Sequence, residues 1–441
     1  MPSSLLRWSL HRFVVACFCL TFGQAALAQS LVLGWHSNLE DACQLAEKNG
    51  KPLFITFRCV RCPECLAWDG QVSQEDVEIA ALRKEFVCVR ITSMNGVNLR
   101  RFEFDYDATW TAFFTDSRLN VYSRYGGRDQ GDPEARLSKP SLLHTMREVL
   151  RVNESVHTAR ANGQDTASSF QPVPADVAKP EDMPLLEKNN QGCVHCHLVR
   201  EYSLLQAYHD GRFRRDLLFT FPLPETLGME IDRQHGHRAA KIQPDSVAAS
   251  CGMKAGDEVV QINGVPIRSE LDIRWSLHRL PLDMSRVTVQ VRREPSDAAS
   301  ANPPIRAQFV TVELKLPPRW REGELGWRKS SRSIPMDWSF RGAAMTETQR
   351  REGNLPLSGL ALNVLSVTPS GFAGALDLQK YDVILALNGD TRERSLEQLR
   401  SDLLRRFTPG DEVRLTIRRA EQTMELKGQF PGWFTEKTSV P

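Results

Sequence analysis

The stretch "KPLFITFRCVRCPECLAWDG" (51–70) decides the fold of the N-terminal part of the chain. Residues 53–57 form a short, mostly apolar run, which is typical of a buried β-strand. Three cysteines follow at intervals of three residues, namely Cys59, Cys62 and Cys65. The pattern predicts a strand that leads directly into a cysteine-bearing helix start.

The segments around this stretch alternate between helix and strand. A helical pattern precedes the break at 50–52, and further strands are expected at 86–91 and 111–116. Strands and helices that alternate at this spacing indicate an α/β sheet. Cys43 and Cys88 fall within these elements and are expected to be core thiols, because free cysteine is among the most buried residue types.

The segment "ITFRCVRCPEC" (55–65) resembles, without gaps, the strand and active-site turn of thioredoxins, and the resemblance covers residues 31–150. It implies that Cys62 is the catalytic nucleophile, that Cys65 is the resolving thiol, and that this site requires no cofactor. A thiol at the start of a helix also faces unpaired N–H groups, which favour the thiolate. A thioredoxin-like domain with a redox pair is therefore expected at 31–150.

Three residues depart from the thioredoxin pattern. Arg61 stands where a tryptophan normally precedes the first cysteine of the pair, and Trp110 stands where the family has a proline that faces the disulfide. The edge that grips substrates in the family is therefore expected to differ here. Cys59 is an additional, auxiliary thiol: either a small buried residue, or a third thiol for metal binding or for disulfide exchange.

The N-terminal residues have the features of a secretory signal peptide. Basic Arg7 and Arg12 precede a short apolar run at 13–22, and an A-x-A site ends at Ala28. This order predicts a signal peptide over 1–28, cleavage near Ala28 and export to the periplasm. No later stretch approaches the twenty apolar residues of a membrane-spanning helix, so no transmembrane segment is expected in the mature chain.

Net charge, chain length and the distribution of cysteines indicate which kinds of function this sequence favours. The 441 residues include 56 Lys and Arg against 54 Asp and Glu, a net charge of +2, so nothing favours nucleic acid as a partner. About 410 mature residues suggest roughly three domains. Of the ten cysteines, Cys17 and Cys19 leave with the signal peptide, and five of the rest lie in two short motifs. This distribution indicates chemistry at two places and not a disulfide scaffold.

The second motif is "CVHCH" (193–197), in a segment expected at 185–221 after a flexible linker rich in Ala, Ser and Pro at 151–184. C-x-x-C-H is the attachment signature of haem c, with Cys193 and Cys196 as thioether sites and His197 as a ligand of the haem iron. Export agrees with this interpretation. Zinc bound by the two thiols and a nearby histidine is an alternative, and so is a plain disulfide between Cys193 and Cys196.

The C-terminal half contains an internal repeat. "SVAASCGMKAGDEVVQINGVPI" (246–267) parallels "SGFAGALDLQKYDVILALNGDT" (370–391), and each is followed by a helix and an alternating strand. The two copies resemble PDZ domains of the kind attached to HtrA-type periplasmic proteases. The resemblance implies PDZ domains at 222–318 and 335–430, a connector at 319–334 and a tail at 431–441.

PDZ domains capture protein C-termini or extended peptides through loop N–H groups and an added β-strand. The resemblance implies that partner proteins bind at two loops, of which the first is the cleaner match: Leu227, Gly228, Met229, Glu230 and Ile231 in the first copy, and Gly359, Leu360, Ala361 and Leu362 in the second. The chain lacks a "GNSGG"-like nucleophile motif, so serine protease activity is excluded.

Together these features predict a multidomain α/β and β-rich protein: a thioredoxin-like α/β domain, the C-x-x-C-H segment, and two PDZ domains as partly open β-barrels. The order resembles a group of bacterial exported thioredoxin-like/PDZ fusion proteins, some of which carry selenocysteine at a redox position. The expected function is extracytoplasmic thiol-disulfide redox or electron-transfer chemistry on partners recruited by the PDZ domains, which would make the protein a thiol-disulfide oxidoreductase. The alternative is a non-catalytic PDZ adaptor whose cysteines bind metal or are structural.

Overall fold

The structure is a computed structural model, which describes residues 34–59, 62–72, 76–129, 131–164, 178–189, 192–294, 306–331 and 339–431. The predicted signal peptide (1–28) and Arg61 lie outside these residues. Within them, no helix is both long and apolar enough to span a lipid bilayer. The fold is mixed α/β with several β-sheets, as predicted, and none of the sheets formed by the described residues closes into a barrel.

The N-terminal domain is built on a five-stranded sheet in the order β1-β3-β2-β4-β5. Strands β1, β3 and β2 run parallel, whereas β4 and β5 are antiparallel to their neighbours. β2 has the bounds that its apolar run predicts. The strands are β1 (Trp35–His36), β2 (Leu53–Phe57), β3 (Val87–Ile91), β4 (Thr111–Thr115) and β5 (Val121–Gly126).

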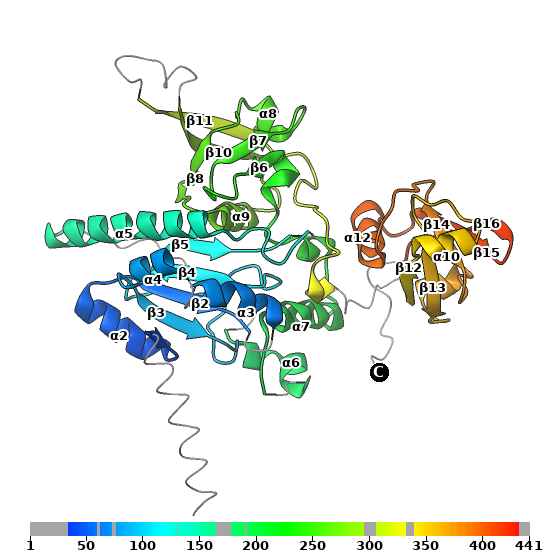
Figure 1. Ribbon diagram of the computed structural model, residues 1–441, viewed down its shortest axis with the longest axis horizontal. Coiled ribbons are helices and arrows are strands. Elements are labelled where there is room, and N and C mark those ends of the chain that lie inside the picture. The colour runs from blue at the N-terminus through cyan, green and yellow to red at the C-terminus, as the bar shows by residue number, and fades with distance from the viewer. Residues whose placement is uncertain are drawn as a thin grey trace, which may run out of the picture.

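Helices cover both faces of this sheet (Figure 1). On one face Phe54 stacks on Phe114, with ring centroids 4.8 Å apart, beneath α3 (Pro63–Gly70), α4 (Val77–Arg83) and α5 (Lys139–Ala161). On the other face Phe57 belongs to a core that includes residues of α2 (Leu39–Asn49), α6 (Pro184–Asn189) and α7 (Cys196–His209). The helix that begins at the C-x-x-C-H motif is thus part of the core of the N-terminal domain.

The linker predicted over 151–184 is wrong at both ends. α5 continues to Ala161, because Val152 and Val156 pack on the core and the Asn153 side-chain amide donates to the Gly50 carbonyl at 3.1 Å. A short helix, η2 (Pro180–Asp182), and the start of α6 occupy the other end. Residues 165–177 lie outside the described residues, so the flexible linker stays a prediction for that stretch alone.

The two C-terminal units, at 222–318 and 335–430, share one order of elements, which agrees with the repeat in the sequence. In both, two strands precede a four-residue helix, a strand, a longer helix and a final hairpin. The first unit consists of η4 (Pro224–Leu227), β6 (Met229–Ile231), β7 (Ala239–Ile242), α8 (Val247–Ser250), β8 (Glu258–Ile262), β9 (Val265–Pro266), α9 (Glu270–His278), β10 (Arg286–Arg293) and β11 (Gln308–Lys315).

The second unit differs by one extra helix between its first two strands, and an isolated bridge between Leu387 and Asp390 stands in place of β9. Its strands form one open sheet in the order β12-β13-β14-β15-β16. Its elements are β12 (Phe340–Ala344), α10 (Glu347–Glu352), β13 (Leu362–Val367), α11 (Phe372–Ala375), β14 (Val383–Leu387), α12 (Leu396–Arg406), β15 (Glu412–Arg419) and β16 (Gln422–Gln429).

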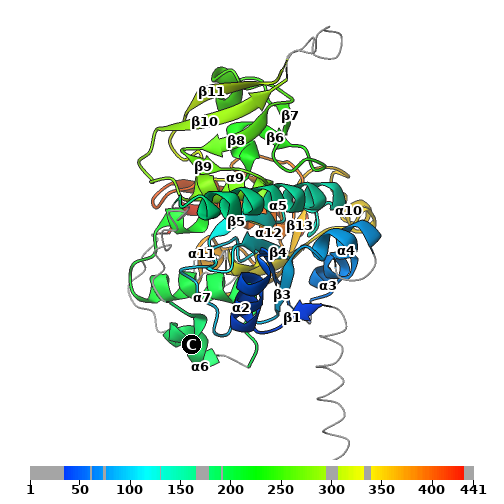
Figure 2. The same ribbon diagram turned by 90° about the vertical axis from the view of Figure 1, so that its left-hand side faces the viewer.

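The first unit sits on the edge of the N-terminal sheet (Figures 1 and 2). The edge strand β5 exposes main-chain groups, and side chains of the first unit satisfy them. Asp272 of α9 accepts from the Arg124 N–H at 3.0 Å and from the Ser123 hydroxyl at 2.6 Å, and Arg268 donates to the Tyr122 carbonyl at 2.7 Å. An unpaired sheet edge is a liability for aggregation, so this docking also protects β5.

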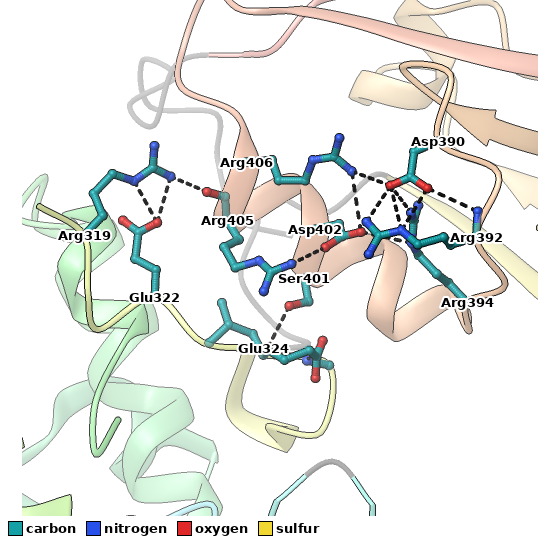
Figure 3. Close-up of polar contacts among 12 residues, drawn as sticks. Arg319, Glu322, Glu324, Asp390, Arg392, Arg394, Ser401, Asp402, Arg405 and Arg406 are labelled. Atoms are coloured by element: carbon teal, nitrogen blue, oxygen red, sulfur yellow. Dashed lines mark hydrogen bonds and ion pairs between the residues drawn. The ribbon is translucent and has the colours of Figure 1, made fainter. Parts of the chain in front are cut away.

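The second unit stands to the side and is attached through the connector (Figure 1). Connector residue Arg319 pairs with Glu322 and donates to the carbonyl of Arg405, in the last turn of α12 (Figure 3). The Ser401 hydroxyl of α12 accepts from the Leu325 N–H at 2.7 Å. Leu325 also belongs to a small core that joins the connector to α7, η3 (Arg215–Leu218) and α12.

A buried carboxylate joins the N-terminal domain to the first unit and the connector. Asp105 is 2% exposed, and its oxygens pair with Arg274 of α9 at 2.6 Å and with connector residue Arg328 at 2.7 Å. Burial alone would raise the pKa of Asp105, but the charges of Arg328 and Arg274 hold it below its ordinary value. We call these three residues the Asp105 cluster.

We predict that Asp105→Ala lowers the free energy of unfolding by about 3–5 kcal/mol. The variant leaves the buried Arg274 guanidinium without its carboxylate partner and leaves Arg328 a single carboxylate contact, the longer one with Asp107, at 3.4 Å. Urea denaturation of the full chain measures this, and the control is Glu421→Ala, which removes an exposed partner of Arg418 and should cost less than about 1 kcal/mol. The Asp105 cluster contributes its full stabilisation of the fold at pH values above the ordinary aspartate pKa, near 4. This contribution is lost as the pH falls through the lowered pKa of Asp105 in the folded protein. Equal losses in the two variants would contradict the prediction.

In each C-terminal unit, two neighbouring positions lie so close together that only one of them can carry a side chain, and the two units differ in which one does. Gly228, just before β6, has φ +87°, and a Cβ there would lie 2.1 Å from the Cβ of Ser246. In the second unit the corresponding pair is reversed, with Ser339 before β12 at φ +62° and Gly371 at the start of α11. A Cβ on Gly371 would lie 2.0 Å from the Cβ of Ser339. Each unit therefore has room for one of the two side chains.

We predict that Gly228→Ser destabilises the first unit by about 1–3 kcal/mol through overpacking, added to about 1 kcal/mol for the left-handed backbone. The double variant Gly228→Ser/Ser246→Gly should recover the overpacking part, because it copies the arrangement of the second unit. Gly252→Ser is the matched control, since Gly252 has φ +82° with open space around its Cβ position. Thermal and urea unfolding test the set, and a double variant no more stable than Gly228→Ser would refute the compensation.

Candidate functional site

The three cysteines of the first motif lie at the end of β2 and the start of α3. Cys62 is the N-cap of α3, with Pro63 in the first turn, and its carbonyl accepts from the Leu66 N–H at 3.0 Å. Cys62 is partly exposed, whereas Cys59 and Cys65 are buried. The structure therefore brings the predicted nucleophile to the surface at a helix N-terminus, with the predicted resolving thiol beneath it.

Cys65 is held in its protonated form. Its thiol donates to the carbonyl of Thr109 at 2.8 Å, in the loop before β4. Burial is the largest cause that raises the pKa of Cys65, and the neighbouring thiols of Cys62 and Cys196 raise it further. A buried thiol of this kind is a poor nucleophile until a disulfide forms next to it, which suits a resolving role.

The residue at the family's proline position is a structural tryptophan. Trp110 is 1% exposed, and its ring lies edge-on to that of Trp68. Its indole N–H donates to Asp69 at 3.4 Å. Asp69 in turn forms an ion pair at 3.0 Å with Arg58, which is the residue before Cys59. Trp110 thus braces the helix and the loop that carry the cysteines.

Hydrogen bonds hold the C-x-x-C-H segment against the N-terminal domain. The Val194 carbonyl accepts from the Met94 N–H at 2.8 Å, and the Gly192 carbonyl accepts from the Asn95 side chain at 3.0 Å. The Val194 side chain is buried in the core that also contains Phe57. The two motifs are about 130 residues apart in sequence, and the loop after β3 joins them in space.

Direct contacts connect the two motifs. The Cys59 sulfur lies 2.9 Å from Nδ1 of His195. Cys196 begins α7, and burial, together with the nearby Cys59 thiol, raises its pKa to about 12. The auxiliary thiol predicted at Cys59 is therefore placed between the thioredoxin-like pair and the second motif.

One cavity of about 470 Å³ collects these groups. It has four thiols and two imidazoles in its wall, along with polar and basic residues from three further segments. The lining residues are Cys59, Cys62, Pro63, Cys65, Asp107, Ala108, Thr109, Arg128, His195, Cys196, His197 and Lys329. We call it the thiol cavity.

Sequence reasoning missed four of its polar residues. Thr109 and Asp107 come from the loop before β4, Arg128 from the loop after β5, and Lys329 from the connector. Asp107 is anchored by the Ser330 N–H at 2.9 Å and the Ser330 hydroxyl at 2.6 Å. The one signal in the sequence was the Trp- and Arg-rich composition of 317–333, which is unusual for a solvated connector.

The residues predicted for haem c occupy this wall in part. Cys196 and His197 line the thiol cavity, and Nδ1 of His197 lies 3.8 Å from the Glu201 carboxylate, which is too far for a hydrogen bond. Two thiols and an imidazole are the donors that haem c requires, so the chemistry of Cys193, Cys196 and His197 fits haem c, which stays a prediction. Zinc also stays a prediction, although no group of three or more His, Cys, Asp or Glu side chains among the described residues has a geometry that holds a metal ion.

The end of the predicted peptide loop of the first unit lies against the N-terminal domain. Leu227 and Met229 are buried in the core of the first unit, whereas Ile231 lines a cavity of only about 30 Å³ together with Tyr125 and Ser141 of the N-terminal domain. Just beyond β6, Arg233 donates to the carbonyls of Leu137 and Glu134 at 3.0 Å and 2.9 Å. In this conformation the segment 134–141 covers the edge where an added strand would lie, so peptide binding at 227–231 stays a prediction for a rearranged state.

The predicted peptide loop of the second unit is assigned to the wrong strand. The Leu360 N–H already donates to the Thr391 carbonyl, and Leu362 begins β13, which pairs with β12 on one side and β14 on the other. A strand paired on both sides has no edge for an added peptide. The edge strand is β12, so the structural counterpart of 227–231 lies at 339–344. Sequence similarity missed it because an insertion separates β12 from β13.

Comparison with known proteins supports two of these domains. Residues 34–116 match a family model described as thioredoxin-like, and residues 238–278 match the model of the PDZ domain. The chain is 28% identical over 160 residues to the periplasmic serine endoprotease DegP of Salmonella typhimurium (strain LT2), a match that covers 36% of this chain and 28% of that protein.

Two Escherichia coli (strain K12) proteins are similar at comparable levels. The periplasmic serine endoprotease DegP is 26% identical over 199 residues, which is 45% of this chain and 35% of DegP. The periplasmic pH-dependent serine endoprotease DegQ is 25% identical over 183 residues, which is 39% of this chain and 32% of DegQ. The chain thus spans about a third of the length of these curated relatives. The protein contains a thioredoxin-like domain, which carries the cysteine pair of the thiol cavity, and a PDZ domain within its first C-terminal unit.

Proposed function

We propose that this protein is a thiol-disulfide redox protein that acts outside the cytoplasm on partner proteins recruited by its PDZ-type units. A thioredoxin-like domain joined to a PDZ domain fits a redox or adaptor role. The observation that carries the redox choice is the position of Cys62 and Cys65. One is a partly exposed thiol at a helix N-terminus, the other a buried thiol beneath it, and both face the thiol cavity.

The chemistry of the pair follows from this difference in exposure. Cys62 is the thiol that a partner's disulfide can reach, and attack by its thiolate gives a mixed disulfide between the two proteins. Cys65 then attacks the Cys62 sulfur and releases the partner's second thiol. One disulfide passes to the protein, and two electrons and two protons pass to the partner. The reverse sequence oxidises a partner dithiol.

Export is supported by the chain's N-terminal sequence and by the similarity to proteins named periplasmic. Recruitment is supported by the PDZ match and by the repeat of its elements in the second unit. Because the edge of the first unit is covered, we propose β12 of the second unit as the strand that pairs with an extended C-terminal peptide.

A non-catalytic PDZ adaptor is the second candidate. The observation that favours it is that four thiols and two imidazoles line the thiol cavity, which are side chains of the kinds that ligate zinc, although no three of them are arranged to hold a metal ion in the described conformation. Metal content and thiol redox state separate the two candidates, because a tightly bound zinc ion keeps thiolates from forming disulfides.

We predict that Cys62 and Cys65 form a disulfide in the purified protein equilibrated with glutathione redox buffers, because Cys62 combines partial exposure with a neighbouring resolving thiol. Differential alkylation and mass spectrometry read the linkage at each ratio of oxidised to reduced glutathione. Cys62→Ser should abolish the linkage and the reduction of a test protein disulfide. Cys43→Ser, which removes a thiol outside the cavity, should leave both unchanged. If Cys62 and Cys65 remain reduced at every ratio, the adaptor is the better description.

We predict that Ala344→Pro weakens binding of free-carboxylate C-terminal peptides at least about tenfold, or 1.4 kcal/mol. The Met345 N–H donates to the Ala361 carbonyl, so by antiparallel alternation the Ala344 N–H points away from β13 and toward an added strand. Proline removes that N–H. Ala344→Thr keeps it and should bind normally. Peptide arrays and fluorescence polarisation measure both, and unchanged binding by Ala344→Pro would exclude β12 as the binding edge.

A further inference from the structure

We propose that the C-x-x-C-H segment is an intramolecular redox partner of the thioredoxin-like pair, so that Cys193 and Cys196 exchange a disulfide with Cys62 and Cys65 across the thiol cavity. The proposal rests on the proposed redox function and extends it. It assigns the second motif a substrate, namely the disulfide or dithiol of the first motif, and makes the protein a carrier of two disulfides instead of one.

The first support is that the structure brings the two pairs together by specific contacts. Main-chain and side-chain hydrogen bonds hold Gly192 and Val194 on the loop after β3. The Val194 side chain is 1% exposed within the domain core, so the segment cannot leave without opening that core. Cys196 is thereby held in the wall of the cavity that Cys62 and Cys65 also line.

The second support is that both motifs place thiols in the wall of one cavity. Cys59, Cys62 and Cys65 of the first motif line it together with Cys196 of the second, and the Cys59 sulfur lies 2.9 Å from Nδ1 of His195, the residue before Cys196. A cysteine pair with a purely structural role would not need to face a redox pair. Of the two cysteines in the second motif, Cys196 is the one that lines the thiol cavity.

The exchange is balanced within the chain. With the second pair oxidised, the Cys62 thiol loses its proton and its thiolate attacks the Cys196 sulfur. The Cys62–Cys196 bond forms, the Cys193–Cys196 bond breaks, and Cys193 leaves as a thiolate that takes up a proton. Cys65 then loses its proton and attacks Cys62, which forms the Cys62–Cys65 bond and releases Cys196 to be protonated. Two electrons move from the first pair to the second, and no outside oxidant is consumed.

The contact between Cys59 and His195 serves this exchange as a positioning element. At 2.9 Å, Nδ1 of His195 can either accept a hydrogen bond from the Cys59 thiol or donate one to its sulfur. The contact joins the loop before α3 to the residue before Cys196. Cys59 itself need not form a disulfide. Replacing it by serine keeps a hydrogen-bonding group at that place and leaves both exchanging pairs intact.

The test traps the intermediate. In the full-length double variant Cys65→Ser/Cys193→Ser both resolving thiols are absent, so oxidised glutathione should produce a stable Cys62–Cys196 disulfide. Proteolysis without reduction followed by mass spectrometry identifies the linked peptides. The matched control, Cys65→Ser/Cys196→Ser, leaves Cys193 in place of Cys196. It should give at least about tenfold less linkage, because proximity in the cavity drives the reaction.

Two further variants test whether the disulfide takes a different route. Adding Cys59→Ser to the trapping variant should leave the yield of the Cys62–Cys196 bond unchanged, and a Cys59–Cys196 bond in the trapping variant in place of Cys62–Cys196 would overturn the proposed route. The single variant Cys193→Ser should show the same mixed disulfide at a lower level, since Cys65 can still resolve it. Circular dichroism and the unfolding midpoint verify that each variant is folded, and the single variant provides the test if a double variant is not.

The remaining outcomes separate this proposal from the function on which it rests. If the wild-type protein forms the Cys62–Cys65 disulfide but no variant yields a Cys62–Cys196 bond, the exchange is refuted and the redox function stands. If Cys62 and Cys65 never form a disulfide, both the exchange and the proposed redox function are refuted. Thioether-linked haem on Cys193 and Cys196, detected by its absorption and mass, or stoichiometric zinc that holds these thiols, would also overturn the exchange.

Discussion

The Asp105 cluster is the interaction on which the arrangement of this molecule depends. One buried carboxylate of the N-terminal domain holds a guanidinium from α9 and another from the connector, so it fixes two separate segments at once. The connector placed in this way supplies Lys329 to the thiol cavity and, through Ser330, anchors Asp107 beside it. A buried charge is tolerated only when it is paired and hydrogen-bonded, and all three members meet that condition only when the three segments are assembled.

The cavity is consequently a product of the whole assembly. The thioredoxin-like domain supplies three cysteines, the C-x-x-C-H segment supplies a fourth with two histidines, and the connector supplies a lysine. The small core around Leu325 then joins α7, which begins at Cys196, to α12 of the second unit. A peptide bound beside α12 would contact a helix that shares this core with the cysteine-bearing helix, so the proposed recruitment and the proposed redox chemistry lie on elements that pack together.

Local patterns predicted the elements, and contacts between distant segments decided the site. The apolar run at 53–57, the cysteine spacing and the C-terminal repeat each carry their information within a few residues, so strand β2, the Cys62 cap and the shared order of elements could be predicted. The contact of Cys59 with His195 could not, because it depends on how a segment 136 residues away packs on the loop after β3. The predicted linker failed at Arg151 because the apolar residues of α5 there are sparse, and polar contacts such as that of Asn153 with Gly50 extend the helix.

The docking of α9 on β5 also explains why the cleaner PDZ match is the less accessible one. Any peptide that pairs with β6 must displace the contacts of Arg233 with Leu137 and Glu134 and compete with the ion pairs of Arg136. The apparent affinity of the first unit is then its intrinsic affinity multiplied by the fraction of molecules in which the domains have separated, and this fraction is small. The second unit does not bear this cost, because its contacts with the connector run through α12 and leave β12 as a sheet edge. The same contacts that build the thiol cavity thus support the proposal that recruitment falls to the unit whose sequence resembles a PDZ domain less closely.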